Sequence, residues 1–255
     1  MCRRFSRIFS RASSSPGRLV SRPKWRVGAG LVVSMVMVLG MVAWSAAPAL
    51  ACSTANGDHC YAEENSFGGT NYGAYGLLDL TCNYMPNNGN FVNTEIWDAN
   101  DSSTDWTEVG VKSGIGYDGD YYSKAWFWAD QRPNGGDYHE HEIGQTATAG
   151  DEYSVETTYI GDSEWAIYGG NSFTDIGTST ANPDSSSGQT NAGTEYTVNS
   201  SSSGIRDVGA VYDIEWESSN GDWHDVGSSG DGYFNGWIGG SYNASGSYVT
   251  WSGPC

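Results

Sequence analysis

The sequence predicts an all-β fold, an antiparallel β-sandwich of the jelly-roll type with about a dozen strands. After residue 51, leucine occurs only at Leu77, Leu78 and Leu80, and no stretch repeats apolar residues with the period of a helix. Tyr, Trp, Thr, Val and Ile instead alternate with polar residues in short runs that Gly, Asn, Asp and Ser interrupt. Such runs are typical of sandwiches and barrels.

The chain begins with a pattern typical of a secretory signal peptide. Eight of the 12 Lys and Arg residues precede Val27, an apolar run follows as far as Trp44, and small residues in an Ala-x-Ala arrangement end at Ala51. We therefore expect residues 1–51 to be a signal peptide and residues 52–255 to be a single β-sandwich domain that is secreted to the extracellular space.

The expected mature domain is strongly acidic. It contains four Lys and Arg residues against all 30 acidic residues of the chain, which leaves a net charge of −26 with histidine neutral. Such a surface repels phosphate backbones and anionic lipids, so we expect no nucleic-acid or membrane partner. No second apolar run is long enough to span a membrane. Self-repulsion favours a monomer.

Four cysteines follow the expected cleavage site, and an even number in a secreted chain predicts two disulfides. Of the three possible connectivities we favour Cys60–Cys82 and Cys52–Cys255. Acylation of Cys52 is the alternative, and it would leave Cys255 unpaired. The cysteine spacings match no zinc ribbon or finger.

The strands are expected where apolar and polar residues alternate. Gly161-Asp162 predicts a tight turn, and the Ser-, Asn- and Thr-rich stretch Ser179–Asn191 predicts a long surface loop. One or two further strands are expected within Gly232–Trp251. The other expected strands are Gly73–Cys82, Phe91–Ala99, Trp106–Lys112, Tyr122–Ala129, Glu152–Ile160, Glu164–Tyr168, Glu195–Asn199 and Val208–Glu217.

Two of these strands carry a glutamate on their polar face. Trp106, Glu108 and Lys112 alternate with Val109 and Val111, which face the other way. In the later strand, Glu195 alternates in the same manner with Tyr196. Two carboxyl groups that come close to each other separate their pKa values, so that one can act as a base and the other as an acid. Such a pair can activate water and protonate a leaving group.

The order of several short motifs resembles that of the secreted glutamic peptidases, both the fungal and the neprosin type, over roughly residues 90–216. The motifs are Trp106-Thr107-Glu108-Val109-Gly110-Val111, Ala125-Trp126-Phe127-Trp128, Ala149-Gly150-Asp151-Glu152-Tyr153-Ser154-Val155 and Gly193-Thr194-Glu195-Tyr196-Thr197-Val198.

The resemblance implies a concanavalin-like β-sandwich and an acid-active hydrolase of polypeptides. It implies a catalytic dyad of Glu108, as the base that activates water, and Glu195, as the acid and oxyanion-side partner. Trp106, Trp128 and Lys112 are expected to bind substrate. The fungal enzymes have Gln where this chain has Glu108. Trp126-Phe127-Trp128-Ala129-Asp130-Gln131-Arg132-Pro133 with Tyr138-His139-Glu140-His141 also resembles small secreted actinobacterial proteins, which implies no activity.

The alternative function is a non-catalytic module that binds a glycan or a surface. Nine of the 11 tryptophans follow residue 51, and Trp and Tyr on a groove can stack on sugar rings. Most of them can equally fill the interior of a leucine-poor chain, and we expect most of Trp97, Trp126 or Trp128, Trp165 and Trp216 to lie in the core.

We expect no cofactor and no metal. The sequence has no Gly-x-Ser-x-Gly, no phosphate-binding Gly-Lys-Ser/Thr and no His-Glu-x-x-His motif. His139 and His141 could share one face of a strand and ligate a metal with His224 or a carboxylate as the third ligand, but ordinary hydrogen bonds are the simpler interpretation. Asp118-Gly119-Asp120 could bind calcium, but a solvated turn is favoured.

Overall fold

The computed structural model describes residues 59–67, 70–86, 90–100, 104–132, 137–180, 188–197, 206–227, 230–234, 239–243, 248–252 and 255. The predicted signal peptide and Cys52 lie outside the described residues. No helix among these residues is long and apolar enough to cross a membrane.

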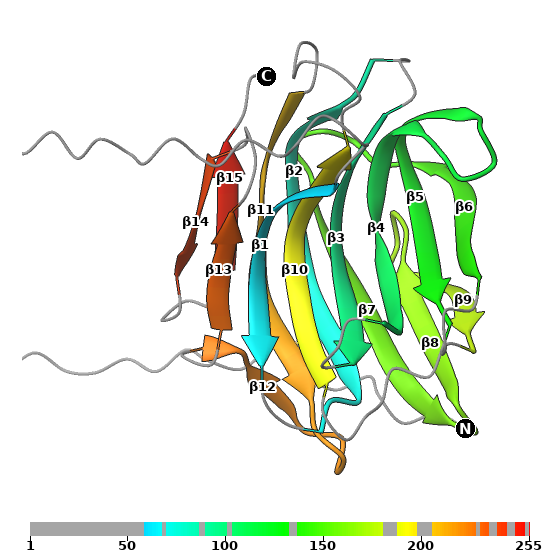
Figure 1. Ribbon diagram of the computed structural model, residues 1–255, viewed down its shortest axis with the longest axis vertical. Coiled ribbons are helices and arrows are strands. Elements are labelled where there is room, and N and C mark those ends of the chain that lie inside the picture. Colours follow the sequence, from blue (N-terminus) through cyan, green and yellow to red (C-terminus); the bar gives the residue numbers. More distant parts are fainter. Residues whose placement is uncertain are drawn as a thin grey trace, which may run out of the picture. The chain divides into compact units, whose positions relative to one another are not determined.

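Two antiparallel sheets form a β-sandwich, which confirms the predicted fold class (Figure 1). The seven-stranded sheet has the strand order β13-β1-β10-β3-β4-β5-β6. Its strands are β1 (His59–Phe67), β3 (Phe91–Asn100), β4 (Trp106–Ile115), β5 (Tyr121–Gln131), β6 (Tyr138–Thr146), β10 (Gly188–Thr197) and β13 (Gly230–Phe234).

The eight-stranded sheet has the order β14-β15-β11-β2-β7-β8-β9, and β12 pairs with β11 beside this path. Its strands are β2 (Gly73–Tyr84), β7 (Glu152–Gly161), β8 (Glu164–Gly169), β9 (Thr174–Ser179), β11 (Arg206–Glu217), β12 (Trp223–Asp225), β14 (Gly239–Asn243) and β15 (Tyr248–Ser252).

The hydrophobic core lies between the two sheets and takes alternate residues of their central strands. Val109, Val111 and Trp126 contribute from the seven-stranded sheet, and Leu78 and Val211 contribute from the other. Trp126, Trp128 and Trp165 are buried as expected, and Trp216 packs against the core. Because the alternate residues of the seven-stranded sheet point away from this core, its outer face is free to carry polar groups.

The structure corrects the sequence-based strands at several places, since β6, β9 and β12 were not among the expected strands. No strand was expected at β1, because its small and polar residues give little apolar alternation. The predicted loop Ser179–Asn191 is wrong over its last four residues, since β10 begins at Gly188. All ten residues of β10 are buried, because it lies between β1 and β3 inside the sheet. Tertiary pairing thus overrides the loop-like composition of this segment.

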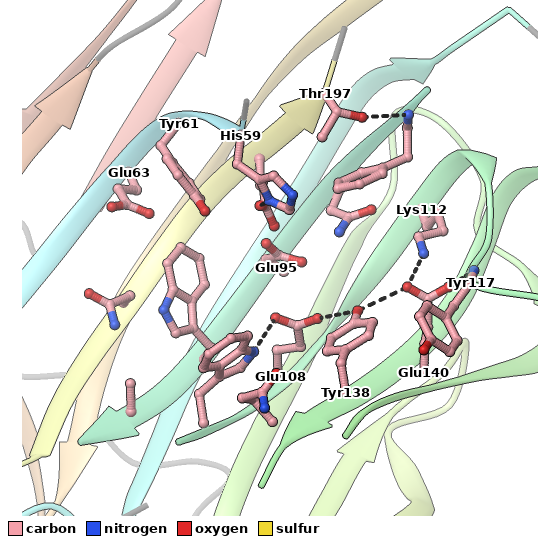
Figure 2. Close-up of a pocket in the computed structure, with 18 of the residues that line it drawn as sticks. His59, Tyr61, Glu63, Glu95, Glu108, Lys112, Tyr117, Tyr138, Glu140 and Thr197 are labelled. Atoms are coloured by element: carbon pink, nitrogen blue, oxygen red, sulfur yellow. Dashed lines mark hydrogen bonds and ion pairs between the residues drawn. The ribbon is translucent and has the colours of Figure 1, made fainter. Parts of the chain in front are cut away.

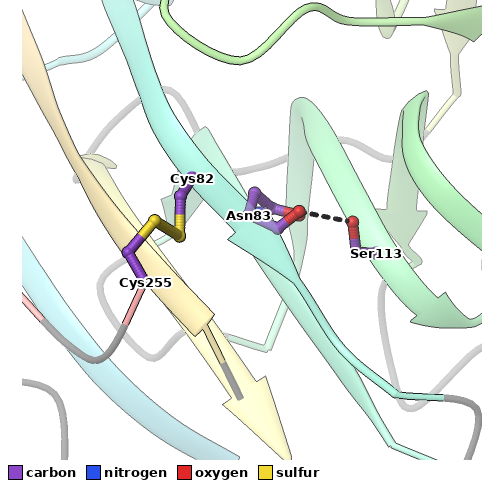
Figure 3. Close-up of a disulfide and its surroundings, with 4 residues drawn as sticks. All are labelled: Cys82, Asn83, Ser113 and Cys255. Carbon is purple, nitrogen blue, oxygen red and sulfur yellow. Dashed lines mark hydrogen bonds between the residues drawn. A yellow bond between two sulfur atoms is a disulfide. The ribbon is translucent and has the colours of Figure 1, made fainter. Parts of the chain in front are cut away.

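A disulfide joins Cys82 at the end of β2 to Cys255, with 6.2 Å between their Cα atoms (Figure 3). The predicted pairs Cys60–Cys82 and Cys52–Cys255 are therefore wrong. Cys60 is also disulfide-bonded. Next to the bridge, the Ser113 hydroxyl donates to the backbone oxygen of Asn83 over 3.0 Å and links the end of β2 to β4.

Candidate active site

The outer face of the seven-stranded sheet carries a pocket of about 810 Å³. Alternate residues of four adjacent strands form its floor, because side chains two positions apart share a face. The lining residues include His59, Tyr61 and Glu63 of β1, Phe91, Asn93, Glu95 and Trp97 of β3, Trp106, Glu108 and Lys112 of β4, Tyr138 and Glu140 of β6, and Asn191, Glu195 and Thr197 of β10.

Five glutamates line this pocket, and three of them come from the adjacent strands β10, β3 and β4. Figure 2 shows two of these three, Glu95 and Glu108, beside each other. Glu95, Glu108 and Glu195 are 1%, 6% and 8% exposed. Glu95 is paired in register with Gly193 on β10 and Gly110 on β4, so no side chain stands next to it on either strand. Burial, together with the charges of Glu108 and Glu195, raises the pKa of Glu95 well above its usual range.

Glu195 accepts hydrogen bonds from three side chains. Its Oε1 contacts Nδ1 of His59, and the Tyr61 hydroxyl and Glu95 also bond to it. Burial and the charge of Glu195 raise the pKa of Tyr61 well above its usual value, so the tyrosine stays a donor. A carboxylate can accept several hydrogen bonds but donates none, and Glu195 is the acceptor in these contacts.

Glu108 lies among different partners. Its Oε2 accepts a 3.1 Å hydrogen bond from Nε1 of Trp106, and its Oε1 lies 3.0 Å from the Tyr138 hydroxyl (Figure 2). Burial, followed by the charges of Glu195 and Glu140, raises the pKa of Glu108 to about 8. Glu108 therefore keeps its proton at neutral pH.

Lys112 supplies a buried positive charge at one side of the pocket. It is 1% exposed, forms an ion pair with Glu140 and lies 5.1 Å from the centre of the Phe127 ring. Burial by itself would raise the pKa of Glu140, but Lys112 and the hydrogen bonds from Glu142 and the backbone of Tyr117 together outweigh burial, and the pKa is lowered. Glu140 is therefore ionised, and its negative charge is paired with the positive charge of Lys112.

Several buried polar atoms of the pocket have no hydrogen-bond partner within the described part of the chain. They are both amide atoms of Asn191, Oδ1 of Asn93 and Oε2 of Glu95. Buried polar groups are normally paired, because an unpaired one costs about 1–3 kcal/mol. A polar ligand with both donors and acceptors would satisfy these atoms.

Four of the five predicted catalytic and substrate-binding residues meet in the pocket: Glu108, Glu195, Trp106 and Lys112. Trp128 does not, since it belongs to the core cluster and stacks on His141 with 4.0 Å between ring centres. On β5, Phe127 and Ala129 lie on the face of the sheet that carries Glu108, whereas Trp128 lies on the opposite face.

Sequence reasoning missed Glu95, Tyr138 and Glu140. The alternation in Phe91–Ala99 placed Glu95 on one face with Trp97, and this signal could have revealed it. Trp97 lines the pocket and is the exception among the tryptophans expected in the core. Tyr138 and Glu140 were missed because their segment was considered only for its two histidines as metal ligands.

The considered metal ligands have other contacts. Nδ1 of His139 lies 3.3 Å from Asp130, and His224 stacks on Trp216. Asp118 is in an exposed turn and accepts a 2.9 Å hydrogen bond from the backbone of Asp120. Among the described residues, no three or more His, Cys, Asp or Glu side chains form a group that could hold a metal ion.

No protein-family model and no curated protein matches this sequence. Solved structures do match it. Scytalido-glutamic peptidase with a peptide-based transition-state analogue matches with a TM-score of 0.51 and 10% identity, over 76% of this chain and 98% of the peptidase. The resemblance lies in the fold.

Other matching structures have lower TM-scores. SCP-B, a member of the Eqolisin family of peptidases in complex with the tripeptide Ala-Ile-His, matches with a TM-score of 0.49 and 11% identity, over 77% of this chain and 98% of that one. Bacillus licheniformis β-glucanase matches with a TM-score of 0.35 and 10% identity, over 75% of this chain and 71% of that one.

Proposed function

We propose that this chain is a secreted hydrolase that cleaves polypeptides with Glu108 and Glu195 as an acid and base pair. The observation that carries the proposal is the difference between two buried carboxyl groups of one pocket. Glu108 holds a proton, with a pKa raised by burial to about 8, whereas Glu195 accepts hydrogen bonds from its neighbours. Groups whose surroundings separate their protonation states are suited to acid and base catalysis.

These surroundings favour the reverse of the roles expected from the sequence. A general base must be ionised before it can take a proton, and Glu108 is protonated at neutral pH. We therefore assign the base to Glu195 and the acid to Glu108.

In the proposed reaction, Glu195 takes a proton from a water molecule, whose oxygen forms a bond with the carbonyl carbon of the substrate. The protonated Glu108 donates a hydrogen bond to the carbonyl oxygen, on which negative charge develops. The C–N bond then breaks, and the nitrogen leaves with the proton that Glu195 took from the water. Both carboxyl groups return to their starting states.

A polypeptide is the favoured substrate for two reasons. The fold is shared with a peptidase that binds a peptide-based transition-state analogue. The unpaired amide of Asn191 offers one donor and one acceptor, which matches the donor and acceptor of a peptide group.

Secretion is proposed from the signal-like residues 1–51 and supported by the Cys82–Cys255 disulfide, since such bonds persist in oxidising compartments. Binding without catalysis is less favoured. A glycan-binding groove needs free aromatic faces and polar groups, but it does not need three carboxyl groups that are costly to bury together.

The test is the cleavage of denatured protein by the purified secreted chain between about pH 3 and pH 9. We expect hydrolysis by the wild type and a loss of about 10²–10⁴-fold in Glu195→Gln, with the melting temperature unchanged. Glu164→Gln, a change of an exposed glutamate on β8, is the matched control. Absence of cleavage at every pH by folded protein would refute the proposal, and a glycan array would then test binding.

A further inference from the structure

The Tyr138 hydroxyl lies between two carboxyl groups and has one hydrogen for both contacts. Its hydroxyl oxygen is 3.0 Å from Oε1 of Glu108 and 3.0 Å from Oε2 of Glu140 (Figure 2). A phenol has a single hydrogen, so it can donate to only one of the two carboxyl groups. The other short contact is a hydrogen bond only if that carboxyl group is protonated and donates to Tyr138.

The surroundings of Glu140 decide the direction of these bonds. Glu140 is paired with Lys112, and its Oε1 accepts a 2.9 Å hydrogen bond from the backbone N–H of Tyr117. It also shares a hydrogen bond with Glu142, whose pKa is raised by burial and by this bond to about 7. Glu140 is thus the acceptor in all of its contacts, and Tyr138 donates to it.

The proton on Glu108 then has an acceptor within reach. Its Oε2 accepts the N–H of Trp106, and a proton on Oε1 lies within hydrogen-bond distance of the Tyr138 oxygen, which can accept it once Tyr138 donates to Glu140. A continuous chain of hydrogen bonds results, in which Glu108 donates to Tyr138 and Tyr138 donates to Glu140, which is held by Lys112.

We propose that Tyr138 is a positioning residue that holds Glu108 in place and follows its protonation by turning its hydroxyl hydrogen between Glu140 and Glu108. This inference rests on the proposed function, in which Glu108 is the acid. When the hydrogen of Glu108 turns to the substrate oxygen, Tyr138 turns its own hydrogen to Oε1 of Glu108. Glu140 loses one hydrogen bond at that moment but keeps Lys112 and the backbone of Tyr117.

The hydroxyl hydrogen moves by rotation about the C–O bond, and the ring stays in place. The ring packs edge-to-face on Tyr117, with 5.5 Å between their centres. A tyrosine is therefore suited to this position, because it can accept from a protonated carboxyl group and donate to an ionised one. A phenylalanine fills the same space and can do neither.

The proposal predicts opposite changes in the titration of Glu108 for two substitutions. The charged and titratable groups that face Glu108 are Glu95 on β3, Lys112 on β4, Glu140 on β6, Glu195 on β10 and the Tyr138 hydroxyl. Tyr138→Phe removes the donor that stabilises ionised Glu108, so the pKa of Glu108 rises. Glu140→Gln removes a negative charge, so the pKa of Glu108 falls.

The experiment is a ¹³C NMR titration of the Glu108 carboxyl carbon, assigned by its absence in Glu108→Gln. We expect a shift of about half a pH unit or more upward in Tyr138→Phe and downward in Glu140→Gln. Tyr75→Phe is the control, since the Tyr75 hydroxyl bonds to Ser154 in the other sheet. The same titration of Glu108 in wild type and Tyr138→Phe, with both proteins folded, would overturn the proposal.

The hydrolysis assay separates this proposal from the proposed function. We expect Tyr138→Phe to lower kcat about tenfold, to leave KM within about twofold, and to move the alkaline limb of the pH profile upward. Wild-type hydrolysis that depends on Glu195 but has the same kcat and pH profile in Tyr138→Phe would refute only the role of Tyr138. A folded wild type without hydrolysis would refute the proposed function and remove the reaction that Tyr138 serves.

Discussion

Glu95 and Glu195 lie on neighbouring strands and share a hydrogen bond inside the pocket. A hydrogen bond between two carboxyl groups requires a proton on one of them. Burial raises the pKa of Glu95 well above its usual range, so Glu95 keeps that proton and donates the hydrogen bond to Glu195. Besides the proposed acid and base, the pocket thus contains a carboxyl group that acts as a neutral donor to the proposed base.

Replacement of Glu95 tests this neutral role. In Glu95→Gln an amide N–H can replace the carboxyl O–H, so we expect hydrolysis within about tenfold of wild type. In Glu95→Leu the bond to Glu195 is lost, and we expect kcat to fall about 10²-fold, as for other lost donors in active sites. The kinetics of both variants at one pH check this prediction. Equal losses of kcat in Glu95→Gln and Glu95→Leu would show that the hydrogen bond donated to Glu195 is not the cause.

The raised pKa of Glu108 predicts the alkaline limb of the activity profile. Above about pH 8 Glu108 loses its proton and with it the hydrogen bond to the substrate oxygen, so kcat/KM should fall. Below about pH 8 Glu108 stays protonated, so activity should persist up to neutral pH. Glu108→Gln keeps an uncharged donor that cannot titrate, and its profile should lack this limb. A limb near pH 8 that persists in Glu108→Gln would assign it to another group.

Asp207 predicts how stability depends on pH. Its Oδ2 lies 2.5 Å from the Thr194 hydroxyl, which also lies 2.7 Å from the backbone oxygen of Asn93. Thr194 has one hydrogen for these two acceptors, so it can donate in only one of the contacts, and a protonated Asp207 can supply the hydrogen of the other. In accord with this, burial raises the pKa of Asp207 from 3.8 to about 7.

The folded chain therefore binds a proton that the unfolded chain releases above its own lower pKa. The free energy of unfolding should fall as pH rises from about 4 to 7, by up to about 4 kcal/mol from Asp207. Asp207→Asn mimics the protonated form and should remove this part of the decline. Urea unfolding at pH 4 and pH 8 measures it. The same decline in wild type and Asp207→Asn would contradict the prediction.

Gly110 gives Glu95 its space. A Cβ at Gly110 would lie 2.7 Å from the Cβ of Glu95 and would also collide with the backbone oxygen of Thr94. Because the neighbouring strand cannot move freely, Gly110→Ala should lower the free energy of unfolding by about 1–3 kcal/mol and displace Glu95. Thermal melting and the kinetics of Gly110→Ala test this. A melting temperature and a turnover equal to those of wild type would show that the strand of Glu95 can move without loss of stability.

The Cys82–Cys255 bridge should stabilise the fold through the unfolded state. It joins residues 173 positions apart, and a bond that closes a long loop typically adds about 2–4 kcal/mol. The double variant Cys82→Ser/Cys255→Ser should lose that amount in urea unfolding, without a change in the titration of Glu108. A stability equal to wild type would mean that native strain cancels the entropic gain.

The sequence by itself predicted the sandwich, most of its strands and the faces of Glu108 and Glu195. These follow from a local rule, since side chains alternate across a strand wherever it is placed. Trp106 and Lys112 were found in the same manner, because they share the face of Glu108 on one strand. The same rule also separates Trp128 from them once the face of β5 is known.

Only the tertiary structure decided which strands are neighbours, and with them the chemistry of the pocket. The placement of β3 between β10 and β4 sets Glu95 among the other carboxyl groups, and the pairing of β6 with β5 brings Tyr138 to Glu108. The protonation of Glu108 and the partner of Cys82 depend on groups far away in the sequence. Burial and charge are properties of packed strands, and no local pattern contains them.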